Sequence, residues 1–145
     1  MKKIFLMLIG FLLIQTAAHA GHYKMIAFSE LPAEARNFVS SKFPNREISY
    51  TAKERDFLEV NYKVIFVDGN KLEFDRNGQW EEIDFKFSAI PDVAVPAPIR
   101  DFIAKQHAGQ TILEIERDRW DYEVKLSNDM ELRFDNDLNF IGLDD

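Results

Sequence analysis

Apolar residues in the first half of the chain recur first at helical spacing and then at every second position. Over residues 32–44 they fall three and four apart, which predicts a short amphipathic helix that begins at Pro32. From Ile48 onwards they alternate with polar residues, which predicts strands, and Asp68-Gly69-Asn70 and Arg76-Asn77-Gly78 are typical of tight hairpin turns. We therefore expect one helix and four antiparallel strands between residues 29 and 87.

The same pattern returns in the second half of the chain. Leu31-Pro32 corresponds to Val95-Pro96, 64 residues later, and Tyr62-x-Val64 corresponds to Tyr122-x-Val124, 60 residues later. This self-similarity predicts a duplicated α-ββββ unit, with copies at about residues 29–87 and 93–145. Residues 88–98 contain three prolines and are expected to connect the two copies.

The duplicated unit predicts an α+β fold. One α-ββββ unit cannot cover its own sheet, whereas two units paired edge to edge form one eight-stranded antiparallel sheet with both helices on one face and the other face open. The alternation predicts that the helix side carries Val60, Tyr62, Val64, Phe66, Leu72, Phe74, Tyr122, Val124, Leu126, Leu132 and Phe134. The open side is expected to carry Glu59, Asn61, Lys63, Lys71, Glu73, Glu123, Lys125, Glu131 and Arg133.

Residues 1–20 have the features of a secretory signal peptide. Lys2 and Lys3 precede an apolar run over residues 4–14, and Ala18-His19-Ala20 has the small residues that a signal peptidase reads. The apolar run is shorter than the roughly 20 residues that span a bilayer, so we expect cleavage near Ala20 and no membrane insertion of the mature chain. Residues 21–145 then form a single domain, periplasmic or secreted, which lacks cysteine and relies on packing alone.

The charge balance is acidic. Loss of Lys2 and Lys3 with the leader changes the balance from 18 basic against 25 acidic residues to 16 against 25, a net charge of −9. Nucleic acid is therefore not expected as a partner, because binding to phosphates needs clustered Lys and Arg. A basic partner or a neutral surface fits this charge better.

Few residues of the mature chain suit catalysis. The two histidines that follow the leader are His22, near the expected new terminus, and His107, at a predicted helix end where an imidazole is favourable beside the last carbonyls. Without cysteine or further histidine, neither a Ser-His-Asp site nor a zinc site has enough side chains. No enzymatic activity, cofactor or metal is expected, although a hydrolase that uses carboxylates stays open as a third hypothesis.

Two acidic turns resemble the start of a calcium-binding loop. They comprise Asp75 and Asn77 in the first half and Asp135, Asp137 and Asn139 in the second. Neither has the glycine at the sixth position or the closing glutamate of a complete loop, and such clusters between strands are typical of hairpin turns. Binding of calcium or a small ligand at these turns is kept as an alternative.

Aromatic residues near turns are candidates for partner binding. Trp and Tyr are common anchors of protein interfaces, although most aromatic residues of this chain fit the predicted core. The candidate contact residues are the aromatics Tyr50, Phe57, Trp80 and Trp120 and the open-face charges Lys63, Glu73, Lys125 and Arg133.

The order of the short motifs resembles the PepSY-like family of exported bacterial proteins, whose fold resembles that of the beta-lactamase inhibitor protein. The matching motifs are Leu31-Pro32, Phe43-Pro44, Tyr62-x-Val64, Asp68-Gly69, Phe74-Asp75, Gly78-x-Trp80, Ile90-Pro91, Pro96, Tyr122-x-Val124 and Phe134-Asp135. The chain departs from the pattern in its second half, where Asn128-Asp129 replaces Asp-Gly and Leu138 replaces a turn glycine. The resemblance implies an inhibitor of a peptidase or other hydrolase that acts through its open sheet face and hairpin loops.

The leading hypothesis is therefore a non-enzymatic exported binding module that docks a protein or peptide partner on the open sheet and its hairpins. The alternative is a periplasmic protein that binds a small ligand or calcium at the Asp75 and Asp135 turns.

Overall fold

The computed structural model describes residues 22–86 and 88–144. The predicted signal peptide at residues 1–20 lies outside the described residues, and so does Phe87. The signal peptide and its cleavage therefore stay predictions.

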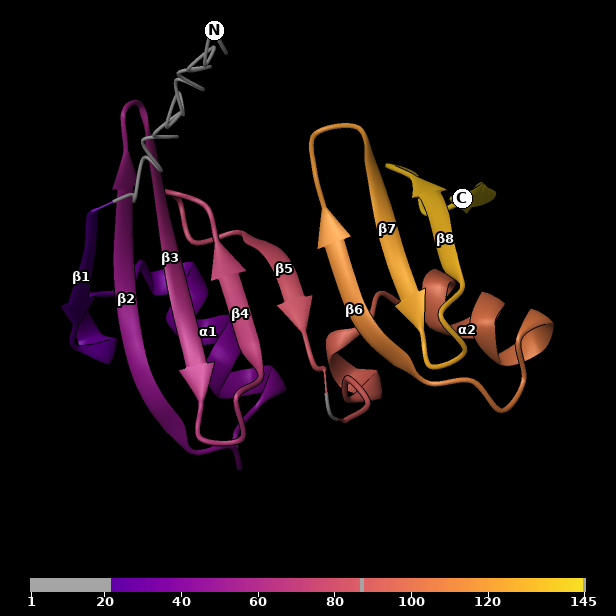
Figure 1. The fold of residues 1–145 in the computed structure, drawn as a ribbon, viewed down its shortest axis with the longest axis horizontal. Helices are drawn as coiled ribbons and strands as arrows, with labels where there is room; N and C mark the ends of the chain where they lie inside the picture. Colours follow the sequence, from indigo (N-terminus) through magenta and orange to yellow (C-terminus); the bar gives the residue numbers. More distant parts are fainter. Residues whose placement is uncertain (1–21, 87, 145) are drawn as a thin grey trace, which may run out of the picture.

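The described residues form one antiparallel sheet in which every strand pairs with its neighbours in the sequence (Figure 1). The strands are β1 (His22–Ile26), β2 (Ile48–Asp56), β3 (Glu59–Phe66), β4 (Lys71–Phe74), β5 (Trp80–Asp84), β6 (Ile112–Arg117), β7 (Asp121–Leu126), β8 (Glu131–Asp135) and β9 (Phe140–Asp144). The α+β class and the open antiparallel sheet are thus confirmed.

The expected count of eight strands is wrong, because the sheet has nine. The additional strand is β1, which precedes the first helix and pairs with β2 from His22↔Arg55 to Ile26↔Thr51. Its sequence, HYKMI, is too short and too polar to show clear alternation. Pairing with the long edge of β2 makes this segment a strand.

Two helices of ten residues cover the same face of the sheet (Figure 1). Helix α1 (Ala33–Lys42) begins after Pro32, and α2 (Ala97–Gln106) begins after Pro96. A proline at the start of a helix lacks only an N–H that would have no partner in the helix. The predicted helix end at His107 is confirmed, since the backbone N–H of His107 donates to the carbonyl of Ile103 at 2.8 Å. Two short 3-10 helices, η1 (Phe28–Glu30) and η2 (Asp92–Ala94), precede α1 and α2.

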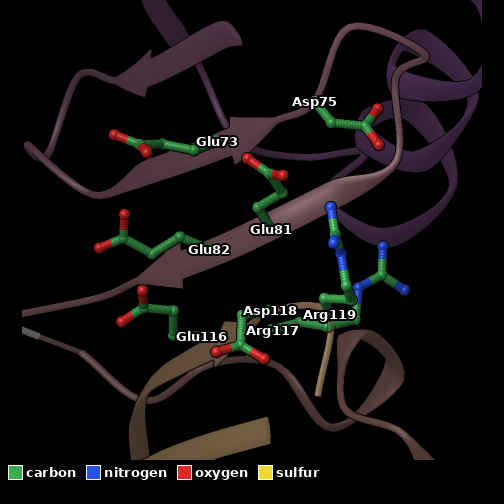
Figure 2. A pocket seen from close by; sticks show the side chains of 8 residues that line it. All are labelled: Glu73, Asp75, Glu81, Glu82, Glu116, Arg117, Asp118 and Arg119. Carbon is green, nitrogen blue, oxygen red and sulfur yellow. The ribbon is translucent and has the colours of Figure 1, made fainter. Parts of the chain in front are cut away.

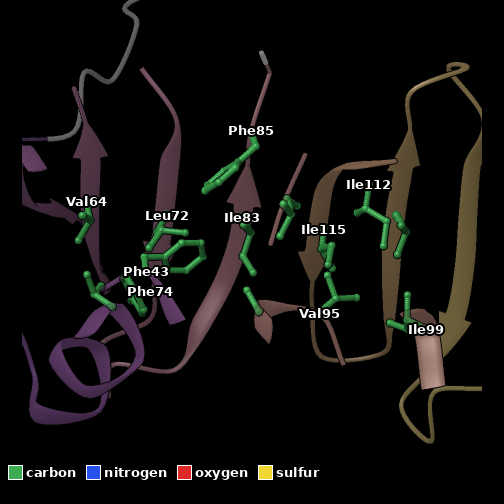
Figure 3. Packing of buried hydrophobic residues seen from close by; sticks show 14 of the residues in the cluster. Phe43, Val64, Leu72, Phe74, Ile83, Phe85, Val95, Ile99, Ile112 and Ile115 are labelled. Atoms are coloured by element: carbon green, nitrogen blue, oxygen red, sulfur yellow. The ribbon is translucent and has the colours of Figure 1, made fainter. Parts of the chain in front are cut away.

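The hydrophobic core lies between these helices and the sheet (Figure 3). Leu72, Phe74, Val124, Leu132 and Phe134 are fully buried, and the other residues predicted on the helix side are buried or half-buried against them. The predicted helix-side face is therefore confirmed.

The two halves of the chain meet where β5 pairs with β6. Ile83 lies opposite Ile115 in this ladder, and both side chains are fully buried. Each helix is followed by four strands, in the order that the proposed repeat predicts. The duplication itself stays a prediction.

Four hairpin turns lie at one end of the sheet, the top edge in Figure 1. The order of the strands requires this, because β2, β4, β6 and β8 run in one direction and β3, β5, β7 and β9 return. We call this end the hairpin rim; its turns are residues 57–58, 75–79, 118–120 and 136–139. The two acidic turns considered for calcium both belong to the rim.

Candidate functional site

A row of carboxylates crosses four neighbouring strands on the open face of the sheet. Ladder pairing aligns the members of this acidic row, which are Glu73, Glu82, Glu116 and Glu123 on β4, β5, β6 and β7. Lys63 of β3 lies opposite Glu73, and Arg133 of β8 lies opposite Glu123, so one basic residue flanks the row at each end. Carboxylates placed directly opposite one another repel, which makes the row unfavourable for the isolated sheet.

Three members of the acidic row line a hollow of about 510 Å³ near the hairpin rim (Figure 2). Figure 2 shows Glu73, Glu82 and Glu116 one above another on three strands, with Asp75 and the two arginines at one side. The hollow is lined by Glu73, Asp75, Glu81, Glu82, Glu116, Arg117, Asp118 and Arg119. Six of these eight side chains are acidic, so the hollow favours a cationic ligand.

The pKa values of several open-face carboxyls are raised. Burial, followed by the charges of Glu73 and Glu114, raises the pKa of Glu82 to about 7 even though the Lys71 ammonium opposes the shift. Burial also raises the pKa of Glu114, with Asp84 as the next cause, and that of Glu123, with Asp144 as the next cause. A cation bound on this face would favour the charged form of these groups.

The β3–β4 side of the row is neutralised by lysines. Lys63 Nζ lies 3.2 Å from a carboxylate oxygen of Glu54 and 3.2 Å from one of Glu73, and it donates a hydrogen bond to the Tyr23 hydroxyl at 2.7 Å. Lys71 Nζ lies 3.1 Å from Glu73. Burial opposes the charged form of Glu73, but Lys71 and Lys63 outweigh it and lower the pKa of this carboxyl. Lys71 Nζ also lies 3.2 Å from Glu82, so within the described residues the members of the row without an ion pair are Glu116 on β6 and Glu123 on β7.

Two groups of three carboxylates lie close enough to share a cation. One comprises Glu82, Asp84 and Glu114, and the other comprises Glu123, Glu131 and Asp144; in each, one oxygen from every side chain lies within 4.8 Å of the others. The Asp84 side chain is buried although it lies on the open face of the sheet, and its ion-pair partner is Lys86, whose Nζ lies 3.9 Å away. Oxygen ligands of this kind suit calcium.

Trp120 projects from the hairpin rim beside the hollow. Its side chain is 73% exposed, and the turn that carries it is held by Asp118, which accepts the backbone N–H groups of Trp120 at 2.6 Å and Asp121 at 3.0 Å. These bonds lower the pKa of Asp118. A well-held turn thus presents an exposed indole next to an acidic surface.

The other predicted aromatic contacts lie in different places. Phe57 is 95% exposed in the β2–β3 turn of the rim, and Tyr50 is 41% exposed on the open face at the far end of β2. Trp80 instead packs on the helix side, with its ring 6.2 Å from Phe38 and 6.1 Å from Tyr122. Trp80 is therefore not part of the open face, because its ladder partner is the core residue Phe74.

The predicted charged contacts are all on the open face. Besides Lys63 and Glu73, Lys125 Nζ lies 3.7 Å from Glu131, and Arg133 forms an ion pair with Asp121. These pairs cross strands on the half-exposed β7–β8 surface, where such pairs contribute little to stability.

The turn carboxylates considered for calcium are engaged in the turns themselves. Asp75 accepts backbone N–H groups from Asn77 at 2.8 Å and Gln79 at 2.9 Å. Asp135 accepts the equivalent bonds from Asp137 and Asn139, both at 2.9 Å, and the bonds lower its pKa. These two carboxylates stabilise tight turns.

Sequence reasoning missed the β5 and β6 part of the acidic row. Glu82, Asp84, Glu114 and Glu116 were not singled out, although their alternation with Ile83 and Ile115 was a usable signal. Only the pairing of β5 with β6 brings them side by side.

A family model described as "Putative beta-lactamase-inhibitor-like, PepSY-like" matches residues 60–142, more than half of the chain. The chain belongs to the PepSY-like family. The resemblance found in the order of the sequence motifs is thus confirmed. No curated protein shows a significant match to the chain.

Three solved structures are similar to this PepSY-like chain over most of their length. A "putative periplasmic protein from DUF2874 family" of Bacteroides vulgatus ATCC 8482 is 40% identical, with a TM-score of 0.81 over 87% of this chain and 99% of its own. A "putative calcium-regulated periplasmic protein" of Bacteroides thetaiotaomicron is 41% identical, with a TM-score of 0.81 over 85% and 97%. A third, also from Bacteroides vulgatus and described as periplasmic and of unknown function, is 31% identical, with a TM-score of 0.78 over 86% and 100%.

Neither helix within residues 22–86 and 88–144 is long and apolar enough to cross a membrane.

Proposed function

We propose that this PepSY-like protein is a non-enzymatic, exported binding module that holds a cationic segment of a protein or peptide partner on its open sheet face. The observation that carries the proposal is the acidic row on β4 to β7, whose carboxylates face one another across the ladder. A positively charged ligand would relieve the repulsion between these carboxylates, and this relief favours binding.

Trp120 supplies the apolar anchor that a charged surface needs. Salt screens charge pairs at the periphery of a protein interface, whereas buried aromatic residues contribute a large share of the binding free energy. The exposed indole lies in the same turn as Asp118 and Arg119, which line the hollow. A partner segment with a basic stretch and an apolar residue beside it would use both features.

A peptidase or other hydrolase that presents such a segment near its active site would be inhibited by this contact. Support for this narrower proposal is the family description and the position of Trp120 and Phe57 on the hairpin rim, where projecting turns can enter a cleft.

The proposal is tested with an arginine-rich peptide that contains one leucine, and with a glutamate-rich peptide of the same length. Isothermal calorimetry of the purified protein should show saturable binding of the basic peptide alone, weakening with salt. We expect the double variant Glu82→Gln/Glu116→Gln to weaken binding about tenfold, and Trp120→Ala by a similar factor.

Glu34→Gln, an exposed carboxylate on α1, is the matched control and should bind as the wild type does. The proposal fails if neither peptide binds, if both bind equally, or if the control weakens binding as much as the double variant does.

A second candidate function is calcium binding on the same face. The carboxylates of Glu82, Asp84 and Glu114 converge there, and one similar structure is described as calcium-regulated. Bound calcium would neutralise the middle of the acidic row and compete with a cationic segment. Calorimetry with calcium chloride should give a heat that Glu114→Gln abolishes and Asp75→Asn leaves unchanged; absence of heat from the wild-type protein rejects this function.

A further inference from the structure

A cationic groove lies on the helix side of the sheet, next to the edge strand β1. Its volume is about 390 Å³, and it is lined by His22, Lys24, Ile26, Glu30, Lys53 and Arg55. Four of the six side chains are basic, in a chain whose overall charge is −7. The groove therefore contrasts with the acidic open face.

The register of β1 and β2 creates this cluster. Lys24 lies opposite Lys53, and His22 lies opposite Arg55. These side chains point to the helix side, because Lys53 pairs across β2 and β3 with the core residue Tyr62 and its ammonium lies 5.6 Å from the centre of that ring. Like charges directly opposite each other destabilise a sheet, so the cluster costs stability when nothing is bound.

The basic side chains of the groove lack acidic partners within the described part of the chain. Lys24, Lys53 and Arg55 form no ion pair there, whereas Lys63 and Lys71 on the open face each contact two carboxylates within 3.2 Å. The one acidic lining residue, Glu30, accepts the backbone N–H of Ala27 at 2.7 Å. The charge of the cluster is thus available to a ligand.

We propose that this groove binds a phosphate group. Two lysines and one arginine against one glutamate leave two formal positive charges, which match a phosphate dianion better than a single carboxylate. A guanidinium offers paired donors that suit phosphate oxygens, and the lysines add point charges. The phosphate can belong to a free anion or to a lipid headgroup, because the groove opens at the edge of the sheet.

The test is titration of the purified protein with inorganic phosphate at constant ionic strength, followed by amide chemical shifts in nuclear magnetic resonance. We expect saturable shifts concentrated in β1 and β2, with affinity reduced about tenfold or more in Arg55→Gln and Lys53→Gln. Lys105→Gln, an exposed residue of α2, should leave the affinity unchanged. Circular dichroism verifies that the variants are folded, and the shifts of the wild-type protein are a readout that needs no variant.

Vesicles of phosphatidylcholine with and without phosphatidic acid distinguish the two sources of phosphate. Co-sedimentation that requires phosphatidic acid and is reversed by added phosphate assigns the groove to a headgroup; saturable phosphate shifts without co-sedimentation assign it to a free anion. The proposal is overturned if phosphate shifts do not saturate or spread over the whole molecule, if Lys105→Gln weakens binding as much as Arg55→Gln, or if a glutamate-rich peptide binds the groove more tightly than phosphate. The open face takes no part in this experiment, so the result is independent of the function proposed for it.

Discussion

Glu73 and Glu82 lie opposite each other on β4 and β5, yet the pKa values of their carboxyls move in opposite directions. Two lysines contact Glu73, whereas Glu82 has one lysine and two acidic neighbours. The same residue type is therefore stabilising on one strand and destabilising on the next. The charges that surround each carboxyl decide whether its ionised form stabilises or destabilises the fold.

Glu82→Gln is expected to stabilise the protein at alkaline pH. The pKa of Glu82 rises from 4.5 to about 7 on folding, so the folded state favours the protonated form. The protonated Glu82 carboxyl therefore contributes to the free energy of unfolding in full below pH 4.5, and this contribution is lost as the pH rises through about 7. At pH 8 the variant should gain about 1 kcal/mol in free energy of unfolding, a value kept small because water screens the group. At pH 5 the gain should nearly vanish.

Glu73→Gln is the matched control and should have the opposite sign. Its lowered pKa means that the charged form stabilises the fold above the unfolded value of 4.5, and that this contribution is lost as the pH falls. Urea unfolding of both variants at pH 5 and pH 8 measures the two effects. A loss of stability in both variants at pH 8 would contradict the account of the row.

At the scale of elements, the β4–β5 turn docks against α1 through Gly78. Gly78 has a φ of +86°, and a Cβ built there would lie 2.8 Å from Pro32 Cβ and 2.9 Å from the Ala35 nitrogen. The turn and the start of the helix thus approach more closely than any side chain allows. This contact sets the position of α1 over the first half of the sheet.

Gly78→Ala is therefore expected to lower the free energy of unfolding by about 3 kcal/mol, because the left-handed conformation and the clash with α1 add. Gly69→Ala is the control, since Gly69 has a φ of +88° but no atom within 4 Å of a built Cβ. Its cost should be about 1 kcal/mol, from backbone conformation alone. Thermal and urea unfolding measure both variants, and equal losses would show that the close approach to α1 is unimportant.

At the scale of the whole molecule, one residue of β6 joins the two halves of the chain. Arg117 donates a hydrogen bond to the Trp80 carbonyl at 2.5 Å, and its guanidinium lies 4.6 Å from the centre of the Trp80 ring. Trp80 in turn contacts Phe38 of α1 and Tyr122 of β7. The β5–β6 ladder and this cluster connect the two units in one core.

The two halves should therefore unfold together in a single transition. Arg117→Gln is expected to lower the free energy of unfolding by about 2 kcal/mol, from the charged hydrogen bond and the contact with the ring. Calorimetry, tryptophan fluorescence and circular dichroism should give coincident transitions for the wild type. Two separated transitions in the wild type would mean that the halves are independent domains.

Much of the local structure could be predicted from the sequence, and much of the site could not. The helix-side face from Tyr62 to Phe134 was predicted, because alternation depends only on near neighbours. Strand β1 was missed, since HYKMI becomes a strand only by pairing with β2. Apart from Glu73 and Asp75, the lining of the hollow was missed, and so was that of the cationic groove, because only the pairing of strands brings these side chains together.

The sequence by itself determined the helices that start at Pro32 and Pro96, the alternation of the strands and the turns closed by Asp75 and Asp135, because each depends on contacts within a few residues. Only the tertiary structure decided which charges share a surface. The register between strands distant in the chain aligned Glu82 with Glu116 and Lys24 with Lys53. Electrostatic interaction depends on distance in space, so the acidic row and the cationic groove exist only in the folded sheet.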